Sequence, residues 1–111
     1  MYKIKPTDSR KIYNQLKQSA KKRNIEFTLT ITDINNLSFP ITCPILGIPL
    51  KYHTGSPKDD SYSVDRKDNS IGYTIDNIEI ISYKANRAKN NLSNEELKKF
   101  VEHYKNINTF F

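Results

Sequence analysis

The amino-acid sequence predicts one α+β domain, with helices at both ends and a strand–loop–strand–helix unit in its second half. Apolar residues recur at helical spacing near each end, whereas two segments in the second half alternate between apolar and polar residues as strands do. The length of 111 residues suits a single domain over residues 1–111 with one modest core. Five Phe and seven Tyr residues distinguish the composition from that of disordered chains.

The first helix is expected over residues 7–23, with Thr7 or Asp8 as its cap. Its apolar positions recur every four residues, at Ile12, Leu16 and Ala20. Residues 27–31 alternate and favour a short strand. Thr32 and Asp33 can then cap a helical turn that runs through Leu37 and is ended by Pro40.

The middle of the chain is expected to form a loop-rich layer. Residues 43–50 are apolar but contain two prolines and a glycine, which favours a hairpin or an extended loop packed on the core. Cys43 is the only cysteine, and we expect a small buried thiol there rather than a nucleophile. Residues 52–60 contain Gly, Pro and adjacent acids, and are expected to be an exposed loop.

The second half is predicted as a strand over residues 61–65, a turn region over 67–76, a strand over 77–81 and a helix over 83–91. Ser93 and Glu96 then form a capping box for a last helix. The apolar positions of this last helix follow helical spacing and are expected to be core rather than a functional surface; they are Leu97, Phe100, Val101 and Tyr104. His103 lies beside this stripe, where a structural role is expected.

Positive charge is concentrated at the start of the chain. The formal net charge is +6, and residues 1–24 hold eight of the 18 Lys and Arg residues with a single acid. A basic excess favours polyanionic partners, although an ordinary solvated helix face is the alternative. The sequence shows no signal peptide and no apolar run long enough for a membrane, so we expect a cytoplasmic protein without a membrane partner.

Polar side chains at the ends of the two strands form a candidate cation site. Asp65 ends the first strand, Asn86 lies on the following helix, and Lys89 is about one turn further on. A carboxylate and an amide oxygen can hold one hard cation such as Mg²⁺, with phosphate oxygens and water completing its shell. The alternative is that Asp65 caps a turn and Asn86 is a surface residue, and spacing alone favours this alternative.

Three ordered fragments resemble a known family. They are Ser63-Val-Asp-Arg-Lys-Asp-Asn-Ser-Ile-Gly-Tyr73, Asn77-Ile-Glu-Ile-Ile-Ser82 and Ala85-Asn-Arg-Ala-Lys89. Together they are similar to the HNH endonucleases (His-Me finger, ββα-metal) of the small phage type, whose pattern is S-x-D-R-x-D-x-x-x-G-Y, then N-hydrophobic, then N-x-x-K. The nine-residue step between the two asparagines also resembles the HNH domain of RNA-guided nucleases. With fragments further upstream, the resemblance covers roughly residues 20–100.

The resemblance implies a ββα-metal core over residues 61–91 and metal-assisted hydrolysis of DNA phosphodiester bonds. It implies that Asp65 and Asn86 bind Mg²⁺ or Mn²⁺, that Asn77 braces the loop between the strands, and that Lys89 lies near the phosphate or the metal. Many relatives also carry two CxxC pairs for structural zinc. Only Cys43 of those four positions is a cysteine here, so no structural zinc is expected.

One departure from the family concerns the general base. Where the family places a histidine after the ligand Asp, this sequence has Arg66, which stays protonated and cannot readily accept a proton. We expect Arg66 to contact the scissile phosphate. His53 is a candidate substitute base, although a lone loop histidine is more often simply exposed. The residues expected to bind nucleic acid are Lys17, Lys21, Lys22, Arg23, Lys84, Arg87 and Lys89.

The expected function is therefore a divalent-metal-dependent DNA endonuclease, phage-encoded and acting in a bacterial host. One alternative is a nucleic-acid-binding module that keeps the fold and has lost catalysis, which Arg66 would allow. Another is a phage accessory or interaction protein whose basic surface meets an acidic partner. The oligomeric state and the cleavage preference are left open by the sequence.

Overall fold

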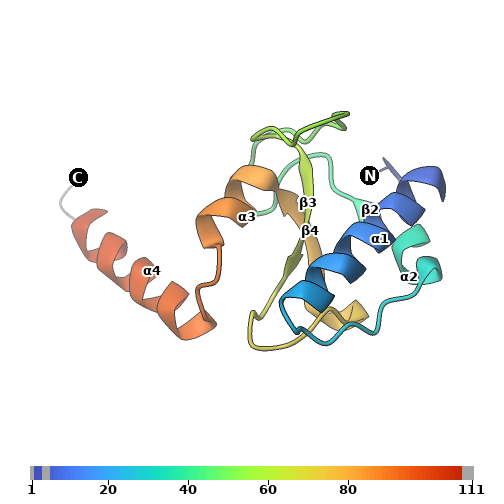
Figure 1. The fold of residues 1–111 in the computed structure, drawn as a ribbon. Coiled ribbons are helices and arrows are strands. Elements are labelled where there is room, and N and C mark those ends of the chain that lie inside the picture. Colours follow the sequence, from blue (N-terminus) through green and yellow to red (C-terminus); the bar gives the residue numbers. More distant parts are fainter. Residues whose placement is uncertain (1, 4–5, 109–111) are drawn as a thin grey trace.

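The α+β class is confirmed in the computed structural model, which describes residues 2–3 and 6–108 (Figure 1). The helices are α1 (Pro6–Lys22), α2 (Ile31–Asn35), α3 (Tyr83–Lys89) and α4 (Asn94–Asn108), with a 3₁₀ turn at Ile75–Asn77. The strands are β1 (Tyr2–Lys3), β2 (Ser38–Phe39), β3 (Tyr62–Arg66) and β4 (Ile78–Ser82). β1 pairs with β2, and β3 with β4, each pair antiparallel.

The β3–β4 hairpin separates two layers of helix. Successive strand residues point to opposite faces, so Val64 and Ile78 share one face and Asp65 and Ile81 share the other. Val64 and Ile78 pack in the core cluster that contains α1, whereas Ile81 packs with Ala85 of α3. The hairpin therefore lies between α1 and α3, as Figure 1 shows.

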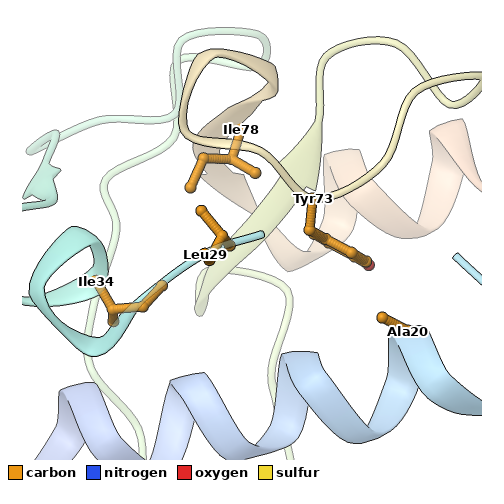
Figure 2. Packing of buried hydrophobic residues seen from close by; sticks show 5 residues of the cluster. All are labelled: Ala20, Leu29, Ile34, Tyr73 and Ile78. Atoms are coloured by element: carbon orange, nitrogen blue, oxygen red, sulfur yellow. The ribbon is translucent and has the colours of Figure 1, made fainter. Parts of the chain in front are cut away.

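The main core forms where α1, α2 and the loop before β4 meet. Figure 2 shows its buried members, Ala20, Leu29, Ile34, Tyr73 and Ile78. The apolar positions of the first helix face this cluster, as their spacing predicts; these are Ile12, Leu16 and Ala20. The long first helix and its buried face are thus confirmed.

Two expected details of the first half are wrong. α1 begins at Pro6, so Thr7 and Asp8 lie within its first turn rather than at its cap, and proline at a first helical position is favourable. Residues 27–31 form no regular strand: only Phe27 makes a bridge, to Tyr73, before α2 begins at Ile31. The backbone groups of this segment bond to the loop after β3 instead of to a strand.

The short helix α2 is present but starts and ends earlier than expected. Its cap is Thr30, whose hydroxyl accepts from the backbone N of Asp33 while the Asp33 carboxylate accepts from the backbone N of Thr30. It ends at Asn35, because Ser38 and Phe39 leave the helix to pair with β1 before Pro40 is reached. Capping by Thr32 is therefore wrong, and Asp33 acts as the reciprocal partner.

The expected hairpin at residues 43–50 and the exposed loop at 52–60 are confirmed. Cys43 N donates to Ile48 O at 2.8 Å, and Leu50 N donates to Ile41 O at 2.9 Å. The Cys43 thiol is buried and accepts from the backbone N of Ser82, which ties the hairpin to the start of α3.

Helix α4 has the expected capping box but not the expected burial. The Ser93 hydroxyl accepts from Glu96 N, and Glu96 accepts from Ser93 N. Phe100, Val101 and Tyr104 are nevertheless 52%, 63% and 53% exposed, and Figure 1 shows α4 extending away from the rest of the molecule. The apolar stripe is not core in the described structure, because helical spacing decides which residues share a face and not what covers that face.

We expect Gly72→Ala to destabilise the protein by about 1–3 kcal/mol, as overpacking of a tight contact does. A Cβ at Gly72 would lie 2.5 Å from the carbonyl oxygen of Glu26, which also accepts from Tyr73 N. The control is Asn91→Ala, a substitution of an exposed residue in the turn after α3. Urea unfolding measures both, and an equal midpoint for Gly72→Ala and the unmodified chain would contradict the tight contact.

Candidate functional site

The site begins with the way α3 is seated on the β3–β4 hairpin. The Ser82 hydroxyl caps the helix by accepting from Ala85 N at 3.1 Å, and Ala85 packs on Ile81 beneath it. Asn86 and Lys89 are three residues apart, so both point from α3 toward β3. Asn86 Nδ2 donates to Ser63 Oγ at 2.7 Å and to Val64 O at 3.4 Å.

Lys89 binds Asp65, which lies two residues beyond Ser63 on the same face of β3. Its ammonium donates to Asp65 Oδ1 at 3.1 Å and Oδ2 at 2.9 Å, to the carbonyl of Arg66, and to that of Lys67 at 3.3 Å. The pair is largely removed from solvent, since the side chains of Lys89 and Asp65 are 9% and 3% exposed. Burial raises the pKa of Asp65, and Lys89 opposes that rise through its hydrogen bonds and its charge.

Asn77 closes the loop that joins the two strands. Its buried side chain accepts from Asp68 N at 3.0 Å and donates to the carbonyls of Asp68, Ile71 and Gly72 at 3.0, 3.2 and 2.9 Å. This amide therefore holds both sides of the loop, in the position that the resemblance implies for it. Asn77 lies in the 3₁₀ turn just before β4 rather than at the first residue of the strand.

Arg66 faces away from Asp65, because neighbouring strand residues point to opposite faces. Its guanidinium donates to the carbonyls of Asn69 and Ile71 at 2.8 and 3.0 Å and lies 5.4 Å from the centre of the Tyr73 ring. The residue is buried. The structure thus gives Arg66 a second bracing role in the loop, from the face opposite to Asp65.

His53 is not brought to Asp65. Its Nε2 lies 2.6 Å from Asp60 Oδ1, and this hydrogen bond lowers the pKa of Asp60. Asp60 precedes β3, whereas Asp65 is near the far end of that strand. Five residues of extended chain separate them, which corresponds to about 16 Å. A substitute base at His53 would need the loop of residues 52–60 to move by a comparable distance.

The basic residues expected to bind nucleic acid fall into two groups on opposite sides of the hairpin. Those on α1 and just after it are exposed; they are Lys17, Lys21, Lys22 and Arg23. The Arg23 guanidinium donates to the Tyr73 hydroxyl at 3.5 Å. On α3, Lys84 and Arg87 are exposed, and Arg87 pairs with Asp59 at 3.0 Å. Lys89 is held by Asp65.

A groove with several polar residues at its rim lies on the α1 side. It lies between α1 and α2 and is lined in part by Arg10, Lys11, Asn14 and Asn35. Guanidinium, ammonium and amide groups of this kind are common phosphate contacts.

Sequence reasoning missed Glu79. The register places Glu79 of β4 directly opposite Asp65 of β3, so both carboxylates lie on the face that α3 covers. Directly opposed residues have Cβ atoms about 4.5–5.5 Å apart. Finding Glu79 from the sequence would require the strand register, and alternation alone does not supply it.

The oxygen atoms around Lys89 suit a hard cation. Both carboxylate oxygens of Asp65 and two backbone carbonyls already converge on a positive charge, with the Asn86 amide and Glu79 nearby. Mg²⁺ and Mn²⁺ prefer such oxygen ligands and retain several waters. Among the described residues, no group of three or more His, Cys, Asp or Glu side chains gathers as a metal cluster. The donors therefore fit a cation that takes the place of the ammonium and completes its shell from outside the chain.

Comparisons with protein-family models, curated proteins and solved structures found no match. Within the part of the chain that the structure describes, none of the helices has the length and apolar character needed to span a membrane.

We expect Asn77→Ala to open the loop and to cost more than the about 1–3 kcal/mol of one unsatisfied buried polar group, because four hydrogen bonds are lost. Asn77→Asp, which keeps the acceptor and removes the donors, should be destabilised as well. Asn91→Ala changes an exposed asparagine and serves as the control. Urea unfolding that gives the same stability for Asn77→Ala and Asn91→Ala would contradict the bracing role.

Proposed function

We propose that this protein is a divalent-metal-dependent endonuclease of the HNH type that hydrolyses phosphodiester bonds in DNA. The observation that carries the proposal is the buried Asp65 of the strand–strand–helix unit β3, β4 and α3. Its carboxylate and two backbone carbonyls already bind a cationic group, the ammonium of Lys89. The ordered likeness of residues 63–89 to the family pattern supports the same assignment. The net charge of +6 suits a DNA substrate.

In this proposal each residue near Asp65 takes the role that its place in the structure suits. Asp65 and Asn86 hold Mg²⁺ or Mn²⁺, and Glu79 adds negative charge beside them. When bound, the metal supplies positive charge for the phosphate oxygens and for the leaving oxygen. Lys89, once free of Asp65, can neutralise a phosphate oxygen. Asn77 and Arg66 keep the loop that supports Asp65 in shape.

The chain lacks a histidine base beside Asp65, so we expect slow hydrolysis. Arg66 occupies the family's base position, but its guanidinium donates hydrogen bonds to backbone carbonyls on the other face of the strand. The absence of one positioned base typically costs about 10²–10⁴ in rate.

A nucleic-acid-binding module without catalysis is the second candidate. It is favoured by the Asp65–Lys89 pair, which neutralises the carboxylate that would hold the metal, together with the inward-facing Arg66. The two candidates differ in one outcome, because both bind DNA and only the nuclease cuts it.

We expect the unmodified protein to nick supercoiled plasmid DNA with Mg²⁺ or Mn²⁺, and Asp65→Asn and Asn86→Ala each to reduce nicking by about 100-fold or more, since a metal ligand contributes several kcal/mol of charge stabilisation. Asp76→Asn, which changes an exposed acid of the 3₁₀ turn, is the matched control and should nick normally. Nicking retained by folded Asp65→Asn would refute the metal-site assignment. DNA binding without nicking by the unmodified chain would instead establish the second candidate.

We expect the basic group on α1 to dominate non-specific affinity for duplex DNA. Replacing Lys17, Lys21, Lys22 and Arg23 by glutamine should flatten the dependence of log Kd on log salt by about 0.9 for each phosphate that the variant no longer neutralises. Glutamine at Lys98, Lys99 and Lys105 removes exposed lysines from α4 and is the control. Fluorescence anisotropy over a salt series measures the slope, and an unchanged slope for the α1 variant would put the DNA surface elsewhere.

A further inference from the structure

The ammonium of Lys89 occupies the place that a bound cation would take. An ammonium group has three protons to donate, and Lys89 directs them at four oxygen atoms, two of Asp65 and two backbone carbonyls. No donor of Lys89 is left over for a phosphate, and each Asp65 oxygen already has a cationic neighbour. In this arrangement the site is filled by part of the chain itself.

We call the oxygen atoms of Asp65, Arg66 and Lys67 that surround this ammonium the Asp65 pocket. A metal ion and the ammonium cannot occupy this pocket together. Both would bind the same carboxylate oxygens, and two positive charges a few ångströms apart in a largely buried site repel strongly. A divalent ion therefore enters only if Lys89 leaves. Lys89 is the last residue of α3, and Asn69 donates to the carbonyls of Asn90 and Leu92 just after it. The backbone is therefore held, also through Ala85 and Asn86, and the ammonium leaves by rotation of the flexible Lys89 side chain alone.

A phosphate group can bind the Lys89 ammonium in place of Asp65. Lysine ammonium groups bind phosphate oxygens through charge-assisted hydrogen bonds, which can replace those broken at Asp65. The exposed Lys67, next to the pocket, adds positive charge where such a phosphate would approach. The same phosphate could then offer oxygen atoms to the incoming cation, which prefers to complete its shell from them.

We infer that Lys89 closes the Asp65 pocket to metal ions in the free protein, and that a nucleic-acid phosphate opens it by taking over the ammonium. This inference rests on the proposed function, because it assumes that Asp65 holds the metal. It makes metal binding depend on DNA binding, so that the free protein keeps its cation site closed and loads it only on a polyanion.

The test measures metal binding rather than cleavage. Mn²⁺ is titrated into the full chain, and free Mn²⁺ is followed by electron paramagnetic resonance, with and without a short phosphorothioate duplex. The variants are Lys89→Met, which keeps the stem and removes the charge, Lys98→Met as an exposed-lysine control on α4, and Asp65→Asn combined with Lys89→Met. Signals from Mn²⁺ bound to the duplex are subtracted with the Asp65→Asn single variant.

We expect Lys89→Met to bind one Mn²⁺ at least about tenfold more tightly than the unmodified chain, one factor of ten corresponding to about 1.4 kcal/mol. Lys98→Met should match the unmodified chain, and the double variant should not bind. Adding the duplex should bring the affinity of the unmodified chain toward that of Lys89→Met. If Lys89→Met folds poorly, Mn²⁺ should raise its melting temperature but not that of the double variant, and a variant that Mn²⁺ leaves unfolded would count against the inference.

Two other results would overturn the inference, and they differ in what they mean for the function. If the unmodified chain and Lys89→Met bind Mn²⁺ equally, with or without duplex, and Asp65→Asn abolishes binding, Lys89 does not close the pocket and the proposed metal site stands. If neither binds Mn²⁺ under any condition, the pocket is not a metal site, and both the inference and the metal-dependent nuclease fail together.

Discussion

The buried pair of Asp65 and Lys89 is the interaction on which the arrangement of the second half depends. A carboxylate removed from water requires a cationic partner, and removing one member of a buried pair typically costs about 3–5 kcal/mol. Asp65 comes from the end of β3 and Lys89 from the end of α3, so the pair ties the strand to the helix that crosses it. The two carbonyls that share the ammonium extend this tie into the loop after β3.

Two further side chains keep that loop in shape from the other directions. Asn77 binds both of its sides from within, and Arg66 binds its carbonyls from the face opposite to Asp65. Strand alternation thus separates the polar residues of this unit into two sets. Arg66 and Asn77 brace the loop, whereas Asp65 faces the cationic group of Lys89. The bracing set explains why polar groups are buried next to an apolar core, since each is satisfied by backbone partners.

The layered fold separates the two basic regions. α1 packs on one face of the β3–β4 hairpin and α3 on the other (Figure 1). The exposed Lys17, Lys21 and Lys22 belong to α1, whereas Lys84 and Arg87 belong to α3. The α1 surface therefore suits general attraction to a polyanion, whereas a reacting phosphate would have to approach near α3 and the loop after β3.

Local patterns in the sequence predict much of the fold, because helices, caps and turns depend on near neighbours. The apolar spacing of α1, the capping box at Ser93 and Glu96, and the prolines and glycine of the hairpin at residues 43–50 all indicate the elements that form. The exposed stripe of α4 could not be foreseen, since burial depends on what packs against a helix.

The sequence likewise predicts some features of the candidate site and not others. The strand–strand–helix order and the nearness of Asp65, Asn86 and Lys89 follow from the expected elements. The opposite orientation of Arg66 and the place of Glu79 beside Asp65 depend on the exact ends and register of the strands, which shift by one residue from the expected positions. The loop-held His53 depends on contacts between segments that local patterns do not encode.

The most direct test of the cation site is paramagnetic broadening of amide NMR signals by substoichiometric Mn²⁺ in the presence of a short duplex. If Asp65 and Asn86 hold the metal, signals of residues 65–67 and 86–89 should broaden first, and they should do so far less when the duplex is left out. Broadening centred on other acids, such as Asp59 and Asp60 or Glu95 and Glu96, with residues 65–67 unaffected, would contradict the account.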